Sequence, residues 1–262
     1  MLEQQFIRLT RDYIDRQSCE MVLPVCAKMP IQFFCACKLN ENTIRVDIVS
    51  PDGTTIKEGV TDDFMFVPDA LFFHVTIDTE VLTEILAPCD CFRIKIQSGY
   101  FSSSTSGSFD TIHYSNILQF ISDNDGYLSD LRYYCNEPQF GLPFFKKNIK
   151  YEEEVALPIH LSKPQFKQTD KIYETRNGEQ IVLYATINKE YSGETDYIPE
   201  EWHERIVTAL SCDEVYIDGE RVTKSDSYEI DQDNCTYSEC GIRLTRATFK
   251  VKTNVTQRNS NC

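Results

Sequence analysis

The sequence has few cationic residues for its length. Its 262 positions hold 26 lysines and arginines against 41 aspartates and glutamates, which gives a formal net charge of −15. Affinity for nucleic acids rests on Lys and Arg side chains that neutralise phosphates, so this balance excludes a sequence-specific nucleic-acid-binding role. An anionic membrane surface is also expected to repel the chain. The acidity favours solubility, or a surface past which DNA can slide without binding.

Long hydrophobic runs are also missing. No apolar stretch approaches the roughly 20 residues that span a membrane, and residues 1–5 lack the basic and apolar regions of a secretory signal. We therefore expect no membrane partner and synthesis in a reducing cytoplasm. The 11 cysteines fit free thiols, because their number is odd and the chain is long enough to build a core without disulfides.

A catalytic constellation is absent from the sequence pattern. The chain has no phosphate-binding glycine loop, no dinucleotide fingerprint and no nucleophile elbow. His74, His113 and His160 lie in expected strands and suit structural roles, while His203 lies on an expected helix without a second histidine at metal-ligand spacing. We therefore predict no enzyme, no catalytic residue and no cofactor, although a pair of carboxylates for glycoside hydrolysis could meet in space without a sequence signature.

Two patterns resemble metal ligands only in part. Cys35-Ala36-Cys37 and Cys89-Asp90-Cys91 are C-x-C pairs, whereas zinc sites favour C-x-x-C, so small buried residues in strands are the simpler interpretation. The acidic turns at 123–126 and 231–233 begin like calcium loops but lack the remaining ligands of an EF-hand. We predict no metal site.

The residues that are present favour strands. The chain has 14 tyrosines, 16 phenylalanines and many β-branched residues, separated by closely spaced turn signals such as Ser50-Pro51-Asp52-Gly53. Residues 43–49 alternate well, with Ile44, Val46 and Ile48 on one face. The expected fold class is mostly β, an antiparallel β-sandwich with one or two short helices, the main one at about 199–210.

The most readable stretch is 172–222, which predicts a hairpin, a helix and a second hairpin. Asn177-Gly178 joins two β-rich runs, and Asp218-Gly219 marks another tight turn. Between them a helix is expected from Pro199, with an apolar stripe that repeats every four residues and must pack on a sheet or a neighbouring chain. The stripe consists of Trp202, Ile206 and Leu210.

The chain divides into four expected parts, although a single interlocked domain is equally open. The parts are a β-rich N-terminal part at 1–97, a mobile Ser-rich loop at 98–110, a C-terminal β-sandwich part at 111–256 and a flexible tail at 257–262. Glu152-Glu153-Glu154 is expected on a solvated strand edge, where charge discourages aggregation. Residues 138–145 are expected to form an irregular aromatic loop, and residues 189–196 a polar connection.

Several segments together support a family resemblance. Residues 115–118, 131–134, 140–144 and 197–222, the last with its Ile-Pro-Glu-Glu-Trp helix and Val-Tyr-Ile-Asp-Gly hairpin, resemble structural proteins of phages of Bacteroides-type bacteria. More narrowly, they are similar to the neck or tail ring proteins of crAss-like phages. The likeness covers roughly residues 90–256 and rests on the order of loose motifs.

The resemblance implies a virion component made in the bacterial cytoplasm. Copies would form a closed homo-oligomeric ring, six- or twelve-fold, that lies between portal and tail tip, contacts other neck and tail proteins, and forms part of the DNA passage. Such a ring closes through heterologous contacts. Aromatic residues favour interface centres, and the candidate anchors are Trp202, Phe140, Phe144, Phe145, Tyr133 and Tyr134, with an ordinary core position as the simpler interpretation of Trp202.

A second interpretation is a β-sandwich module that binds carbohydrate or a host surface. Aromatic residues on expected loops would form its platform, namely Tyr100, Phe101, Tyr133, Tyr134 and residues 140–145. A monomer with saturable glycan binding would distinguish this module from a ring subunit.

Overall fold

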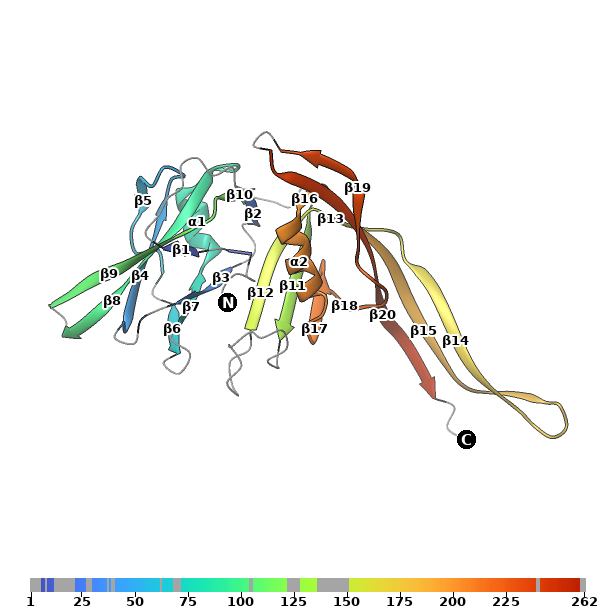
Figure 1. The fold of residues 1–262 in the computed structure, drawn as a ribbon. Helices are drawn as coiled ribbons and strands as arrows, with labels where there is room; N and C mark the ends of the chain where they lie inside the picture. Colours follow the sequence, from blue (N-terminus) through green and yellow to red (C-terminus); the bar gives the residue numbers. More distant parts are fainter. Residues whose placement is uncertain are drawn as a thin grey trace.

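The structure is a computed structural model (Figure 1) that describes residues 6–7, 9–11, 22–26, 30–36, 38, 41–61, 63–67, 72–103, 106–121, 128–135, 151–238 and 241–259. This part of the chain is mostly β, with antiparallel sheets in a sandwich-like arrangement and two helices, which confirms the predicted fold class. Neither helix of the described part is long and apolar enough to cross a membrane.

The N-terminal half holds a seven-stranded sheet and a three-stranded sheet. The larger sheet has the order β1-β9-β8-β10-β2, with β4 paired to β8 and β5 paired to β4, and the smaller has the order β3-β7-β6. Ile44, Val46 and Ile48 are buried, as their alternation predicts. The elements are β1 (Leu9–Arg11), β2 (Leu23–Cys26), β3 (Ile31–Ala36), β4 (Thr43–Val49), β5 (Thr55–Lys57), β6 (Phe64–Val67), β7 (Phe72–Ile77), α1 (Thr79–Ile85), β8 (Cys91–Ser103), β9 (Ser106–Ser115) and β10 (Leu118–Ile121).

The C-terminal half is a ten-stranded sheet with one helix. Its order is β12-β11-β17-β18-β20-β15-β13, and β14, β16 and β19 pair with β15 or β20. The elements are β11 (Ser129–Cys135), β12 (Tyr151–Leu157), β13 (Ile159–Leu161), β14 (Gln165–Glu174), β15 (Gln180–Thr195), β16 (Ile198–Pro199), α2 (Glu200–Ala209), β17 (Glu214–Ile217), β18 (Glu220–Lys224), β19 (Glu229–Tyr237) and β20 (Arg243–Asn259).

Helix α2 forms where the sequence predicts it. Pro199 is its N-cap residue, and Glu200 and Glu201 occupy the first turn, where the helix dipole favours negative charge. The predicted stripe faces the interior, since Trp202, Ile206 and Leu210 are 6%, 0% and 3% exposed. The helix packs against β16 and β20, so the sheet supplies the apolar surface that so short a helix needs.

His203 is fully buried on the sheet side of α2. Its Nε2 lies 3.1 Å from the carbonyl oxygen of Thr245, and its Nδ1 lies 2.6 Å from the hydroxyl of Tyr228. An Nε2–H that donates to Thr245 leaves Nδ1 to accept from Tyr228, so a neutral ring satisfies both contacts. Burial lowers the pKa of His203 and raises that of Tyr228. His203 therefore has a structural role, of the kind expected for the three histidines in strands.

Phe6, near the N-terminus, contacts β12 and α2 of the C-terminal half. Its backbone N–H donates to Glu153 of β12 at 2.9 Å, and its carbonyl accepts from Arg205 of α2 at 3.0 Å. The Arg205 guanidinium also lies 5.7 Å from the centre of the Phe6 ring, and Tyr133 donates to Glu153. One hydrophobic cluster of described residues runs from Phe6 through both halves.

The expected Ser-rich loop at 98–110 is wrong, because its described residues continue strands β8 and β9 as an antiparallel ribbon. Ser98 is fully buried beside β4. The expected boundary at this loop is wrong for the same reason: β9 and β10, assigned to the C-terminal part, belong to the N-terminal sheet, and the sheet changes between β10 and β11. Serine composition suggested mobility, but backbone pairing with β4 and within the ribbon decides the structure.

Other expectations are wrong where polar residues lie in long strands instead of in connections, a tail or a solvated edge. Glu153 is 2% exposed rather than solvated, because it accepts the hydrogen bonds of Phe6 and Tyr133. Residues 189–195 continue β15, and 257–259 extend β20 opposite 184–186 instead of forming a flexible tail. Residues 231–233 lie in β19. The predicted turn at 123–126 and loop at 138–145 lie outside the described residues.

Candidate assembly interface

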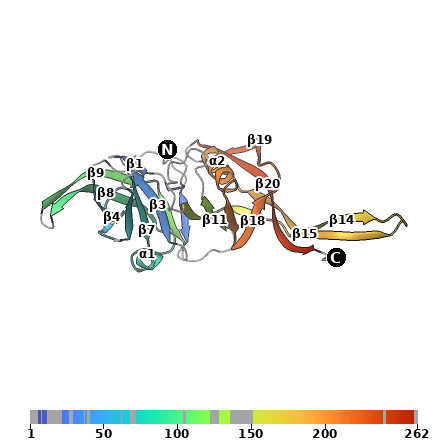
Figure 2. The ribbon, with the colours of Figure 1, turned by 90° about the horizontal axis from the view of Figure 1, so that it is seen from below.

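A long β-hairpin, β14–β15, projects from the C-terminal sheet and ends far from the rest of the chain (Figures 1 and 2). We call residues 165–187 the arm. Its turn is the predicted Asn-Gly turn: Gly178 adopts a φ of 80°, and its N–H donates to Thr175 at 2.9 Å. Glycine tolerates this positive φ without strain. Ten residues of β14 pair with β15, with a register shift between Lys171 and Ile172.

The arm carries most of the exposed large hydrophobic side chains of the described residues. Every residue of β14 is exposed. Of the seven such side chains, five lie on the arm: Phe166 (64%), Ile172 (51%), Tyr173 (55%), Ile181 (40%) and Val182 (47%); the other two are Ile56 and Tyr237. Single exposed apolar residues are ordinary on protein surfaces, but a cluster of them marks an interaction site.

Cross-strand pairing places these residues on both faces of the arm tip. Ile172 lies opposite Val182, and Tyr173 lies opposite Ile181 in the next register position. Successive residues of a strand point to opposite faces, so each face of the tip presents one apolar pair. A partner that grips the tip would bury both pairs at once.

The base of the arm is paired and packed against the rest of the C-terminal sheet. β15 pairs with β20 from Glu194–Thr248 out to Tyr184–Asn259, and Gly193 allows close packing, because a Cβ added there would lie 2.4 Å from Cζ of Phe249. Tyr191 donates to Glu220, which Lys189 also contacts at 3.2 Å. Burial, followed by the bond to Glu220, raises the pKa of Tyr191 to about 12, and the Tyr191 bond lowers the pKa of Glu220. These contacts join the base of the arm to β18 and β20.

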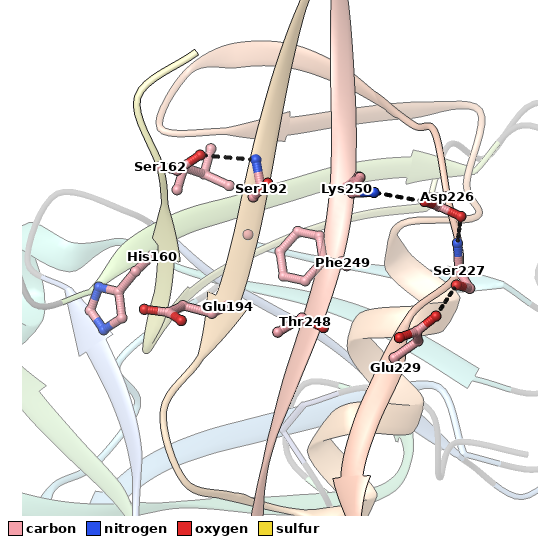
Figure 3. Close-up of a pocket in the computed structure, with 12 residues that line it drawn as sticks. His160, Ser162, Ser192, Glu194, Asp226, Ser227, Glu229, Thr248, Phe249 and Lys250 are labelled. Carbon is pink, nitrogen blue, oxygen red and sulfur yellow. Dashed lines mark hydrogen bonds and ion pairs between the residues drawn. The ribbon is translucent and has the colours of Figure 1, made fainter. Parts of the chain in front are cut away.

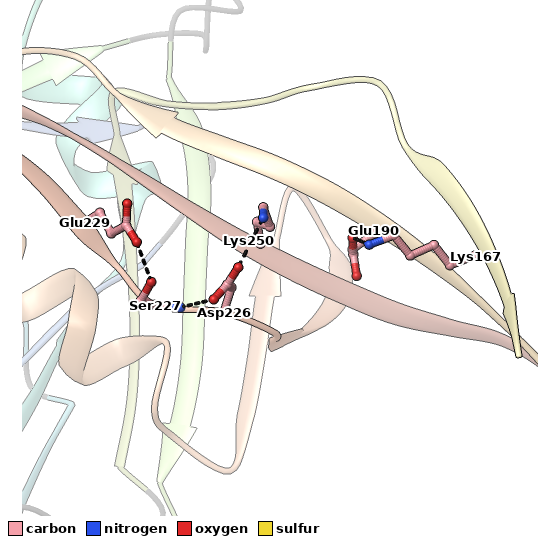
Figure 4. A network of polar contacts seen from close by, with 6 residues as sticks. All are labelled: Lys167, Glu190, Asp226, Ser227, Glu229 and Lys250. Carbon is pink, nitrogen blue, oxygen red and sulfur yellow. Dashed lines mark hydrogen bonds and ion pairs between the residues drawn. The ribbon is translucent and has the colours of Figure 1, made fainter.

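Charged side chains continue along the outer face of this base (Figure 4). Lys167 of β14 pairs with Glu190 of β15, and Lys250 of β20 lies 3.1 Å from Asp226. The bond from the Ser227 N–H and then the Lys250 contact lower the pKa of Asp226, and Asp226 raises that of Lys250. Exposed pairs of this kind add little stability, and they leave a polar surface at the arm base in contrast to the apolar tip.

A shallow hollow of about 440 Å³ lies beside the arm base (Figure 3). Glu194 of β15 and Glu229 of β19 flank Thr248 of β20 in one register row, and His160 lies opposite Glu194. The side chains that line the hollow are therefore mainly polar and acidic. Within the described residues, no group of three or more His, Cys, Asp or Glu side chains is arranged to hold a metal ion.

A second projection lies at the other end of the molecule (Figures 1 and 2). We call residues 100–103 and 106–108, the distal parts of β8 and β9, the ribbon. β4 pairs with β8 only as far as Gly99, and β1 pairs with β9 at 113–115. Among the described strands, the two strands of the ribbon pair only with each other.

The structure describes three of the six candidate anchors, and their environments differ. Trp202 and Tyr133 are buried, at 6% and 3% exposure, in the single core cluster. Tyr134 is half-buried and packs edge-on against Tyr216, with Arg132 over both rings. Phe140, Phe144 and Phe145 lie outside the described residues.

Sequence reasoning missed the exposed residues of the arm, although it placed the hairpin. From the sequence alone, the apolar residues of this hairpin cannot be distinguished from those of a half-buried sheet. One available signal was charge on both faces of β14, where Lys167, Asp170, Lys171 and Glu174 leave no purely apolar side.

The sequence matches no protein-family model, and no curated protein matches it either.

Proposed function

We propose that the protein is a structural subunit of a phage virion that assembles into a closed ring in the neck or tail. The observation that carries the proposal is the pair of projections at opposite ends, one of which bears five of the seven exposed large hydrophobic side chains of the described residues. A contact between opposite ends of two copies is heterologous, and repetition of such a contact closes into a ring when the rotation permits.

The paired base of the arm supports this function. A ring needs a fixed angle between neighbours, and a flexible tether would not set one. The pairing of β15 with β20 and the close approach of Gly193 to Phe249 hold the arm in one direction. The arm is thus suited to impose a constant rotation between copies.

The net charge of −15 supports a passage for DNA. An acidic lumen repels phosphates, so DNA would pass through without being held. The proposal places the ring between portal and tail tip, with other neck and tail proteins as neighbours and with six- or twelve-fold symmetry.

The test is the mass of the purified protein across concentration, by multi-angle scattering and mass photometry in reducing buffer, followed by electron microscopy of the species formed. We expect a discrete assembly of six or twelve copies with a central opening. Low-salt gel-shift assays should show no retention of duplex DNA. A monomer at every concentration, or tight DNA binding, contradicts the proposal.

A second candidate, a carbohydrate-binding module, rests on the hollow at the arm base rather than on the aromatic platform. The platform loses Tyr133, which is buried, whereas the hollow has the size of small-ligand sites. Carboxylates such as Glu194 and Glu229 accept hydrogen bonds from sugar hydroxyls. Saturable glycan binding by a monomer, lost in Glu194→Gln with Glu229→Gln, would favour this candidate over the ring.

A further inference from the structure

We infer that the tip of the arm of one copy docks into the hollow at the arm base of the next copy. This inference rests on the proposed ring function and names the two surfaces that build the contact between neighbours. The partner is a second copy of this chain.

The two faces of the arm tip differ in charge. Successive residues of a strand point to opposite faces, so Lys171 and Tyr173 lie on one face of β14, whereas Asp170 and Glu174 lie on the other. Ile181 lies opposite Tyr173 and shares its face. We call Lys171, Tyr173 and Ile181 the lysine face. It combines an exposed apolar pair with a positive charge.

The hollow carries the opposite charge. Three carboxylates and one ammonium group line it, so its formal charge is 1 − 3 = −2 with histidine neutral; these groups are Glu194, Asp226, Glu229 and Lys250. Glu194 and Glu229 lie in one register row across Thr248. Complementary charge selects the orientation of a contact, and like charges oppose it. The lysine face is therefore the face that suits the hollow, and the opposite, acidic face of the tip is not.

The hollow also has room for the apolar pair. Its volume of about 440 Å³ is that of a small-ligand site, and Leu161 and Phe249 line it among the polar side chains. A tyrosine ring packs on apolar atoms, while its hydroxyl can donate to a carboxylate. In the inferred contact, Tyr173 enters the hollow and Lys171 lies toward Glu194.

The tip cannot reach the hollow of its own chain. Ile181 at the tip and Gly193 at the hollow lie on the same strand, β15, 193 − 181 = 12 residues apart. At about 3.3 Å per residue this separation is roughly 40 Å, and the arm points away from the body in two perpendicular views (Figures 1 and 2). Only another molecule can bring a tip to this hollow.

The tip and the hollow are different patches of one chain, so their contact is heterologous. Such a contact leaves a tip on one copy and a hollow on the other, and it continues from copy to copy as the proposed ring requires. A contact between two tips would instead be isologous and would stop at a dimer.

The arm variant removes the apolar pair of the lysine face. It carries Tyr173→Thr and Ile181→Thr, at positions that are 55% and 40% exposed. The matched control carries Ile172→Thr and Val182→Thr, which are 51% and 47% exposed and lie opposite each other on the acidic face. Threonine is β-branched and suits a strand, so both variants keep the hairpin while one face loses its apolar atoms.

The hollow variant carries Glu194→Lys and Glu229→Lys. Its matched control carries Glu80→Lys and Glu84→Lys, because these two exposed residues of α1 give the same change in net charge far along the chain from the hollow. Circular dichroism and thermal melting confirm that every variant folds.

The arm variant and the hollow variant should each be monomeric at concentrations where the unmodified protein assembles. We expect a loss of at least about tenfold in affinity, equivalent to about 1.4 kcal/mol. Both control variants should assemble normally. An equimolar mixture of the arm and hollow variants should give 1:1 dimers and nothing larger, because one competent tip and one competent hollow remain.

Reversal of charge tests the orientation. Lys171→Glu alone should weaken assembly, since it brings an anion to the acidic hollow. Lys171→Glu combined with Glu194→Lys in one chain should recover part of the loss, because every contact then joins the reversed charges. A double-mutant cycle measures this coupling, whereas purely structural effects of the two substitutions would add.

Three results overturn the inference. If the arm and hollow variants assemble like the unmodified protein, the ring stands and this interface is wrong. If the control at Ile172 and Val182 fails while the arm variant assembles, the tip docks through its acidic face. If the unmodified protein stops at a dimer or stays monomeric at every concentration, both this interface and the proposed ring are contradicted.

Discussion

The arm and helix α2 are neighbours in sequence, but different interactions stabilise them. Around α2, the side chains of Trp202, Ile206 and His203 are enclosed by the sheet. On β14, every residue is exposed. Backbone pairing with β15 and β20 maintains the arm, while apolar burial maintains the body.

The side chains of the arm can therefore be exposed although the arm is part of a stable fold. An isolated hairpin of two strands is marginal in water, and the arm persists because β15 continues into the body and pairs with β20 over most of its length. Stability is therefore supplied at the base, which leaves the tip residues available for a partner. Substitutions should have large effects on folding near α2 and small ones at the tip.

The largest expected effect is at Trp202. Trp202→Ala should reduce the free energy of unfolding by roughly 3–5 kcal/mol, because a large buried ring leaves a cavity. The matched arm variant Tyr173→Ala should change it by less than about 0.5 kcal/mol, since the ring is 55% exposed. Urea denaturation of both variants measures the contrast, and similar losses in the two would break the distinction between arm and body.

The next effect is at the junction of the two halves. Glu153→Ala removes the acceptor of the Phe6 N–H and of the Tyr133 hydroxyl, and should destabilise the protein by roughly 2–4 kcal/mol, because each unsatisfied buried donor is costly. Glu153→Gln keeps an acceptor oxygen and should lose less. Denaturant titration compares them, and a harmless Glu153→Ala would mean that the junction does not depend on this carboxylate.

At the arm base, Gly193→Ala should cost roughly 1–3 kcal/mol through overpacking. The added Cβ would lie 2.4 Å from the ring of Phe249. Phe249→Leu in the same chain provides room and should recover part of the loss, a coupling that a double-mutant cycle detects. Additive losses would show that the close approach does not limit this site.

Stability should depend on pH through His203. Burial holds the folded pKa below the ordinary value of 6.5, so the unfolded state takes up a proton first as the pH falls. The contribution is complete above about pH 6.5 and is lost as the pH falls towards the folded pKa, with a slope of at most about 1.4 kcal/mol per pH unit. His203→Gln lacks it. A difference between the two proteins that stays constant from pH 8 to 5 would contradict this.

The smallest effect on global stability is expected at the arm turn. Gly178→Ala forces a Cβ into a φ of 80°, a local strain of roughly 1 kcal/mol. Hydrogen exchange should become faster in β14, while the global unfolding transition stays within experimental error. A clear shift of that transition would show that the arm unfolds together with the body.

The local elements could be predicted from the sequence where short-range signals agree. The turn at Asn177-Gly178, the helix after Pro199 and the alternation of 43–49 all match the structure. The apolar face of β20 has the same kind of regular period, since Ala247, Phe249 and Val251 alternate along the strand and are buried. In each case the residue pattern repeats with the period of its own backbone.

The candidate interface was only partly predictable. The sequence placed the β14–β15 hairpin, but its exposure depends on which other strands lie over it. Conversely, Trp202 and Tyr133 were reasonable anchors by residue type, yet both pack inside the chain. Residue chemistry alone does not distinguish an aromatic side chain in a core from one at a surface.

The sequence by itself determined the β class, the two Asn-Gly and Asp-Gly hairpins, the helix at 200–209 and the net charge of −15, because each depends on neighbouring residues or on composition. Only the tertiary structure decided that Ser98 and Glu153 are buried, that residues 257–259 pair with β15, and that the two projections lie at opposite ends. Those features depend on contacts between residues far apart in the chain, for which a local pattern carries no signal.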